Sequence, residues 1–262
     1  MKAAATVPAK TIAKRPATRM SLKETMSALE KAGSAQTRKT YARHGAQEPM
    51  FGVSFAVLKT LVKRIGVDQE LAVALWATKN HDARTLAAKI ADPARIKPSD
   101  LERWTRDSGM RMCNGYVAML AAESPQGPVK AREWLASSDA TLRAAGWRVA
   151  GFLANLDEQI PDDWFAQRLA QIEKSIHSAS NDEREAMNMA VIAIGGRSTA
   201  LRKAATAAAT RIGKVEVDHG DTACKTPDAR TYIETMWAHA NAKKFASPAA
   251  QERARESMRT RC

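Results

Sequence analysis

Tryptophan recurs at a nearly constant interval along the middle of the chain. Intervals of 28, 30 and 30 residues separate Trp76, Trp104, Trp134 and Trp164. An arginine follows three of these tryptophans closely and begins an apolar run, as at Arg84. A period of about 20–50 residues is typical of stacked helical hairpins, because each hairpin is too thin to bury its own apolar face. The spacing therefore predicts a repeat protein whose tryptophans pack between the layers.

The chain from Ser21 onward has the residue pattern of helices. Apolar residues recur three and four positions apart, alanine is abundant, and no window alternates Val, Ile and Thr with polar residues. Ser21 and Glu24 have the spacing of a capping box, and so do Ser99 and Glu102. We therefore predict an all-α fold, a superhelical stack of antiparallel helix pairs with about a dozen helices.

The two ends of the chain differ from its middle. Residues 1–20 are basic, contain two prolines and have almost no large apolar residue, so they are predicted to be a disordered tail. Residues 21–246 form the predicted repeat domain, and residues 247–262 a basic C-terminal helix or tail. We expect the arginines of this last segment on a solvated outer face, namely Arg253, Arg255, Arg259 and Arg261.

The charge of the chain indicates its kind of partner. The 41 Lys and Arg residues exceed the 28 Asp and Glu residues, which gives a net charge of +13. An extended polyanion is therefore the leading partner, and an evenly spread charge that serves solubility is the alternative. There is no apolar run of about 18 residues, no apolar segment of a secretory signal and no paired set of cysteines. We expect a cytoplasmic protein that spans no membrane.

Four arginines are candidates for contacts with the polyanion: Arg84, Arg111, Arg143 and Arg197. If they occupy equivalent places in successive hairpins, their guanidinium groups form a row on the concave side of the stack. Each lies near an expected helix N-terminus, where free amides and the helix dipole also favour anions. Such a row suits the phosphates of a DNA duplex, so binding should depend strongly on salt and weakly on sequence.

Other reactive groups give weaker signals. The segment Asp218–Cys224 holds only one His and one Cys, whereas a structural zinc site normally uses paired motifs, so no metal site is predicted. Cys113 has no histidine fixed near it and is expected in the core. The sequence has no glycine-rich phosphate loop or dinucleotide motif, so we expect no cofactor.

Several stretches of small and apolar residues carry a resemblance to known proteins. They are Glu70–Thr78, Asp82–Ile90, Leu142–Gly146, Ser180–Arg184 and Ala193–Ser198. In order and spacing, roughly residues 50–215 resemble the AlkD-like DNA alkylation repair proteins, a family built of HEAT-like helical repeats. The segment 218–229 also resembles a tail found in a bacterial subgroup of that family.

The resemblance implies a specific chemistry. Active members of the family excise cationic alkylated purines, such as 3-methyladenine and 7-methylguanine, from duplex DNA. A carboxylate stabilises the sugar cation, aromatic side chains pack against the DNA backbone, and an arginine holds a phosphate. The resemblance places this arginine at Arg143 but places the carboxylate at Asn114, which is neutral. Of the two tryptophans of the family, the first falls near Gly109 or Met110 and the second near Met189.

Asp107 is the candidate substitute for the missing carboxylate. It precedes Asn114 by seven residues, which is one face of a continuous helix, but Gly109 is expected to break that helix. We therefore expect a monomeric, nucleoid-associated bacterial protein that binds duplex DNA, is related to alkylpurine DNA glycosylases and has weak or lost base excision. The alternative is a non-catalytic HEAT-like module that binds a DNA structure or another protein.

Overall fold

The computed structural model describes residues 20–261. These residues form fourteen α-helices and no strand, and one isolated bridge pairs Gly33 with Val53. The predicted all-α fold is confirmed. Except for Met20, the predicted tail at residues 1–20 lies outside the described residues, and so does Cys262.

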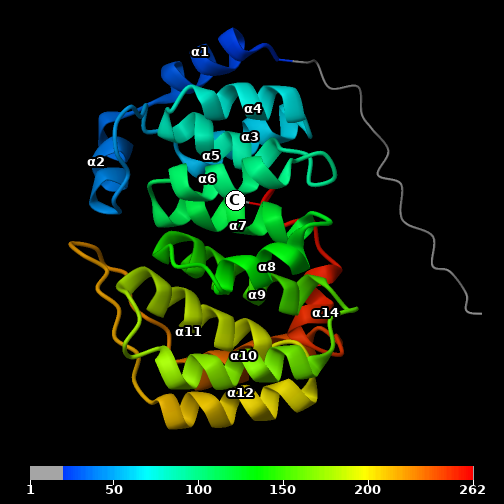
Figure 1. Ribbon diagram of the computed structural model, residues 1–262. Helices are drawn as coiled ribbons and strands as arrows, with labels where there is room; N and C mark the ends of the chain where they lie inside the picture. The colour runs from blue at the N-terminus through cyan, green and yellow to red at the C-terminus, as the bar shows by residue number, and fades with distance from the viewer. Residues whose placement is uncertain (1–19, 262) are drawn as a thin grey trace, which may run out of the picture.

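The helices follow one another as layers of a stack (Figure 1). Their order is α1 (Leu22–Ala32), α2 (Ala35–Arg43), α3 (Phe55–Ile65), α4 (Gln69–Ala77), α5 (His81–Ile90), α6 (Pro98–Asp107), α7 (Arg111–Glu123), α8 (Gly127–Leu135), α9 (Ala140–Leu156), α10 (Asp162–Ser175), α11 (Asn181–Gly195), α12 (Thr199–Ile212), α13 (Ala229–Ala242) and α14 (Pro248–Arg253). The central helix α9 packs against α7, α8 and α11. Within residues 20–261, no helix has the length and apolar composition that a membrane span requires.

The two predicted capping boxes have different outcomes. The Ser21 hydroxyl accepts the Glu24 N–H at 3.2 Å, and the Glu24 carboxylate accepts the Ser21 N–H at 2.8 Å, so the first box is confirmed. Ser99 instead lies inside the first turn of α6, because the helix begins at Pro98. Proline suits the first helical position, since that position needs no N–H donor. The proline therefore overrides the spacing of Ser99 and Glu102.

Three of the four tryptophans fill the core between layers. The rings of Trp76 on α4 and Trp104 on α6 stack with 4.4 Å between centroids, and both are fully buried, as is Trp134 on α8. Trp164 is only partly buried. It lies in the first turn of α10, whereas the other three lie in the second half of their helices. Trp164 packs against the edge of the core without being buried in it, so it does not occupy the equivalent place in its repeat.

Small residues let the central helices approach one another closely. A Cβ atom on Gly146 of α9 would lie 2.8 Å from the backbone nitrogen of Leu135 on α8. A Cβ atom on Gly151 would lie 3.4 Å from the Cα of Ala190 on α11. Because interiors are close-packed, a larger side chain at Gly146 would push α9 away from α8. The small-residue pattern at 142–146 is thus a packing motif.

Arg259 is buried, contrary to the prediction of a solvated side chain, whereas Arg255 is exposed as predicted, and Arg253 and Arg261 are partly buried. Only 3% of Arg259 is exposed. Its Nη1 donates to three carbonyl oxygens at the end of α5, at 2.7–3.1 Å, and its Nε donates to Glu123 of α7 at 2.8 Å. The last carbonyls of a helix lack partners within it, and a guanidinium supplies five donors. Residues 254–261 therefore fasten the ends of two neighbouring helices.

Candidate nucleic-acid interface

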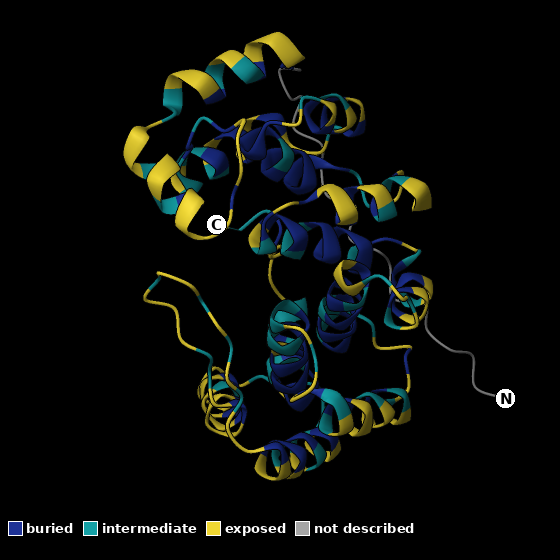
Figure 2. Ribbon diagram, turned by 60° about the vertical axis from the view of Figure 1, so that its left-hand side comes forward, coloured by how far each residue is buried: buried dark blue, intermediate teal, exposed yellow. Residues whose placement is uncertain are grey.

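The N-terminal ends of α5, α7, α9 and α11 lie on one side of the stack, which we call the open side. Arg84 on α5 donates to the backbone oxygen of Asp107, four residues before α7 begins, at 2.6 Å. Arg143 on α9 donates to Glu183 on α11 at 3.1 Å. Helix α2 and the segment 213–228 flank this side near the two ends of the stack (Figures 1 and 2).

Asn114, the fourth residue of α7, is buried on the open side with its amide held at both ends. Its Nδ2 donates to the Thr105 oxygen at 3.3 Å and to the Ser108 hydroxyl at 3.2 Å. Its Oδ1 accepts a hydrogen bond from Arg148 Nη1 at 2.8 Å. A carboxylate could accept from Arg148 but could not donate to Thr105. The surroundings of Asn114 therefore suit a neutral amide.

Arg148, rather than Arg143, is the arginine that contacts Asn114. The side chain of Arg148 is only 8% exposed. Arg143 lies one and a half turns earlier on α9 and donates to the backbone oxygens of Ser137 and Ser138 at 3.1 and 2.8 Å. Sequence reasoning chose Arg143 as the phosphate-binding arginine, both from the repeat pattern and from the family resemblance. The sequence does indicate a special role for Arg148, because Arg148 is the one charged residue in the otherwise apolar stretch 144–154. A buried cation in such a stretch needs a polar partner.

Two carboxylates of α11 hold Arg148 and Arg111. Arg148 donates two hydrogen bonds to Asp182, one from Nη1 at 3.1 Å and one from Nη2. Its Nη2 also lies 3.6 Å from the carboxylate of Glu185. Arg111 Nε lies 3.2 Å from Asp182, and Arg111 Nη1 lies 2.8 Å from Glu185. Each arginine thus contacts both carboxylates. We call these four residues the charge cluster, and their formal charges sum to zero.

The arginines keep the carboxylate of Asp182 ionised. Burial alone would raise the pKa of Asp182. The hydrogen bond and positive charge of Arg148, together with those of Arg111, outweigh burial and hold the pKa below its ordinary value. Asp182 is therefore an anion at neutral pH, and its negative charge offsets that of the arginines around it.

The structure separates the four arginines that were expected in one row. The fourth residue of the helix is an arginine in α5, α9 and α11, namely Arg84, Arg143 and Arg184. Arg84 and Arg184 donate from Nε to a carbonyl eight residues earlier, at 3.4 and 3.2 Å, at the end of the preceding helix or just beyond it. Arg111 is the first residue of α7, and Arg197 follows α11. The assumed equivalence is therefore wrong for Arg111 and Arg197.

Arg197 lies at the opposite end of α11 from the charge cluster. About 22 Å of helix separates it from Asp182, at a rise of 1.5 Å per residue. Its Nε donates to Asp162 at 2.9 Å, and its other nitrogens donate to three carbonyl oxygens between residues 154 and 160 at 2.6–3.1 Å. Arg197 thus fastens the start of α12 to the α9–α10 connection. Arg111 and Arg143, in contrast, converge on the first turns of α11.

Asp107, the candidate substitute carboxylate, lies on a different helix from Asn114. Helix α6 ends at Asp107, and Gly109, with φ of +68°, turns the chain before α7, so the expected break is confirmed. The carboxylate of Asp107 lies 4.0 Å from Arg84. Asp182 is the carboxylate that shares a donor with Asn114, because both accept from Arg148 Nη1.

Cys113 lies in the core, as expected from the sequence. Burial raises the pKa of the Cys113 thiol to about 12. The reactive thiolate form is therefore nearly absent at neutral pH. This environment argues against a nucleophilic role beside Asn114.

Exposed cations flank the charge cluster. Lys39 and Arg43 lie on α2, Lys79 precedes α5, and Lys225 and Arg230 lie toward the other flank. None of these five side chains forms an ion pair within residues 20–261. Helix α2 holds three cations and no acidic residue, whereas residues 213–230 hold three cations and four acidic residues, so the flank at α2 is the net positive one.

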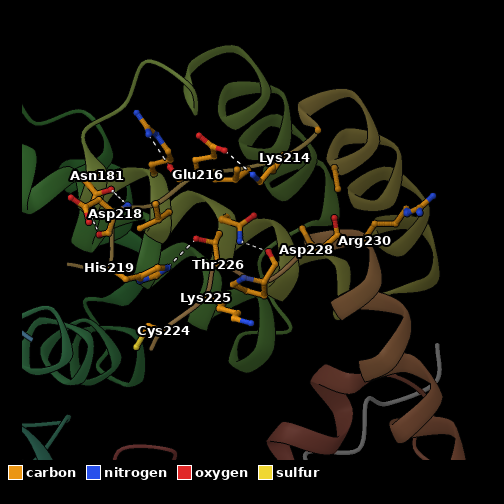
Figure 3. Close-up of a pocket in the computed structure, with 18 of the residues that line it drawn as sticks. Asn181, Lys214, Glu216, Asp218, His219, Cys224, Lys225, Thr226, Asp228 and Arg230 are labelled. Atoms are coloured by element: carbon orange, nitrogen blue, oxygen red, sulfur yellow. Dashed lines mark hydrogen bonds and ion pairs between the residues drawn. The ribbon is translucent and has the colours of Figure 1, made fainter. Parts of the chain in front are cut away.

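One face of α11 holds the segment 213–228 against the stack. Asn181, Arg184 and Asn188 each hydrogen-bond the backbone of that segment at 2.7–3.0 Å. A cavity of about 1010 Å³ lies between α11, α12 and the segment. Figure 3 shows His219 turned toward Thr226, with 3.0 Å between Nε2 and Oγ1. Among residues 20–261, no group of three or more His, Cys, Asp or Glu side chains is placed to hold a metal ion.

Comparison with known proteins identifies the family. A family model described as DNA alkylation repair enzyme matches residues 25–233. Two uncharacterized proteins, Lin0241 of Listeria innocua and Lmo0209 of Listeria monocytogenes, are each 29% identical over 207 residues. The match covers 76% of this chain and 89% of each relative. The chain therefore belongs to the DNA alkylation repair family.

A solved structure has the same architecture. It represents a family of proteins related to the HEAT-like repeat DNA glycosylases with affinity for branched DNA structures. Its sequence is 30% identical, the match covers 87% of this chain and 97% of that chain, and the TM-score is 0.76. The fold is thus a HEAT-like stack of helix pairs, and the AlkD-like resemblance of the sequence is confirmed.

Proposed function

We propose that the chain binds DNA along the open side, prefers branched DNA to a linear duplex, and does not excise alkylated bases at an appreciable rate. The observation that carries this proposal is Asn114, a neutral amide bound to Arg148 where the family resemblance places a carboxylate. Membership of the DNA alkylation repair family supports DNA as the partner. The affinity of the structural relative for branched DNA supports the preference.

The chemistry of the open side supports a loss of base excision. Cleavage of the bond to a cationic base generates an oxocarbenium-like sugar, which an unpaired anion nearby stabilises. Asn114 offers no negative charge, and its oxygen already accepts from Arg148. The charge of Asp182 is offset by two arginines within hydrogen-bonding distance. DNA that lies across this surface would therefore be held without efficient cleavage.

The distribution of charge supports the preference for branched DNA. The charge cluster is neutral, whereas α2 is net positive and the two cations Lys225 and Arg230 lie exposed on the other flank. The arms of a branched DNA diverge, so two arms can contact two separated flanks, while a straight duplex gains little at the neutral centre. Both flanks belong to one chain, so a monomer suffices for binding. Such a protein would be found with the bacterial nucleoid.

The proposal is tested by comparing a four-way junction with a linear duplex of matched sequence. Fluorescence anisotropy at several salt concentrations should show tighter binding of the junction and affinity that falls with salt. The double variant Lys39→Ala/Arg43→Ala should flatten the salt dependence by about two units of slope. The matched control Lys63→Ala/Arg64→Ala removes one lysine and one arginine at the opposite end of the helix pairs. Equal affinity for the two DNAs, or equal effects of the two variants, would contradict the proposal.

A further inference from the structure

Each of the two arginines in the charge cluster could bind a DNA phosphate. In the structure, both arginines are instead bound to the two carboxylates of the cluster. We propose that Asp182 and Glu185 compete with DNA phosphates for Arg111 and Arg148, and thereby set which DNA the open side accepts. This inference rests on the proposed function, because it concerns how DNA gains access to the open side.

Arg148 is the fixed partner in this competition. Its side chain is 8% exposed, and its Nη1 also donates to Asn114. A guanidinium stays protonated, and its planar fork accommodates two oxygens of a carboxylate or of a phosphate. Arg148 therefore keeps its position and charge whichever anion fills the site.

Asp182 is the mobile partner. It is the second residue of α11, and 40% of its side chain is exposed, so its carboxylate can rotate toward water. Within residues 20–261, the side chain of the N-cap Ser180 caps no amide of α11. The first-turn amides are therefore open to a displaced Asp182, and the helix dipole favours an acidic residue there. The carboxylate thus has a second stabilised position once it leaves the arginines.

The competition makes the open side selective. With both carboxylates in place, the cluster is neutral and offers no net attraction to phosphate. With both displaced, Arg111 and Arg148 present two positive charges. Phosphates crowd together where strands converge at a branch, so a branch displaces the carboxylates more readily than a linear duplex does. Asp182 and Glu185 are therefore specificity-determining residues that act through the arginines.

The variants Asp182→Asn, Glu185→Gln and the double variant test this competition. Anisotropy titrations should show that they bind a linear duplex about 2- to 10-fold more tightly than the wild type does. The gain in affinity for a four-way junction should be smaller, so the affinities for the junction and the duplex should become more nearly equal. The salt dependence should steepen by about one unit of slope for each arginine that gains a phosphate. The matched control Glu173→Gln removes a carboxylate that accepts two bonds from Arg211 on the surface of α12.

Arg111→Ala in the wild-type and Asp182→Asn backgrounds completes a double-mutant cycle. If the carboxylates compete with DNA, much of the gain from Asp182→Asn is lost without Arg111. Thermal melting establishes that each variant is folded, and Glu185→Gln gives an independent test if Asp182→Asn is unstable. Gains no larger than that of Glu173→Gln, or weaker binding, would overturn the competition.

These titrations separate this inference from the proposed function. Junction-selective binding by the wild type with no gain in the variants would leave the proposed function standing and remove the competition. Binding by the variants alone would support the competition and overturn the proposed function of the wild type. A failure of the wild type and every variant to bind DNA would overturn both.

Discussion

Replacing Arg259 with alanine should destabilise the stack far more than replacing an ordinary surface arginine. The guanidinium of Arg259 bonds three carbonyl oxygens at the end of α5 and the carboxylate of Glu123. Arg259 is 3% exposed, and the side chain of Glu123 is largely buried as well. The substitution therefore leaves a carboxylate without its charged partner and helix-end carbonyls without donors, where water has little access.

The magnitude follows from the burial of this ion pair. Removing one partner of a buried pair costs about 3–5 kcal/mol. In a chain of this size, each kcal/mol shifts Tm by about 2–4 °C, so Arg259→Ala should lower Tm by about 6–20 °C in a calorimetric scan. Arg255→Ala is the control, because Arg255 is 40% exposed and 3.7 Å from Glu252, and should cost about 0–1 kcal/mol. Equal shifts for the two variants would refute the view that the buried Arg259 fastens the end of α5 to Glu123.

Three further predictions concern buried groups beneath the open side. The fully buried Asp82 accepts three backbone N–H groups of residues 51–53 at 2.7–3.0 Å, so Asp82→Ala should lower the free energy of unfolding by about 3–5 kcal/mol in urea titrations, and a loss below about 1 kcal/mol would contradict this role. Burial lowers the pKa of His81, so the unfolded chain binds the proton more readily, and the stability that neutral His81 contributes is lost as pH falls below its ordinary pKa. His81→Gln should therefore reduce the fall in unfolding free energy between about pH 7.5 and 5, and an undiminished fall would count against this assignment. A thiol reagent should label exposed Cys224 rapidly and buried Cys113 only after denaturation, whereas rapid native labelling of Cys113 would show that the helix opens.

The helical architecture could be predicted because its determinants are local. The spacing of Trp76, Trp104 and Trp134 reflects one place in successive repeats, and Ser21 with Glu24 marks a helix start that needs only neighbouring residues. The same reasoning failed for Trp164, since spacing alone does not tell where in a helix a residue lies. Local patterns therefore located the layers but not every residue within them.

The charge cluster could not be predicted because it depends on which distant side chains meet. Arg111 and Asp182 come from helices that are neighbours only in the folded stack. Arg143 matched the repeat pattern, yet it bonds the backbone before its own helix, while the contact with Asn114 belongs to Arg148. Composition similarly indicated a solvated Arg259, because nothing nearby in the sequence shows that helix ends lie within its reach.

We propose that this protein binds DNA without excising bases because Asn114 stands where a carboxylate would be needed. The most direct test incubates methylated duplex DNA with the wild type and with Asn114→Asp and measures free 7-methylguanine. The wild type should release no base above background under conditions in which it binds the DNA. Asn114→Asp adds a negative charge that the neutral charge cluster does not offset, and should therefore raise the release. Robust release of 7-methylguanine by the wild type would contradict the claim.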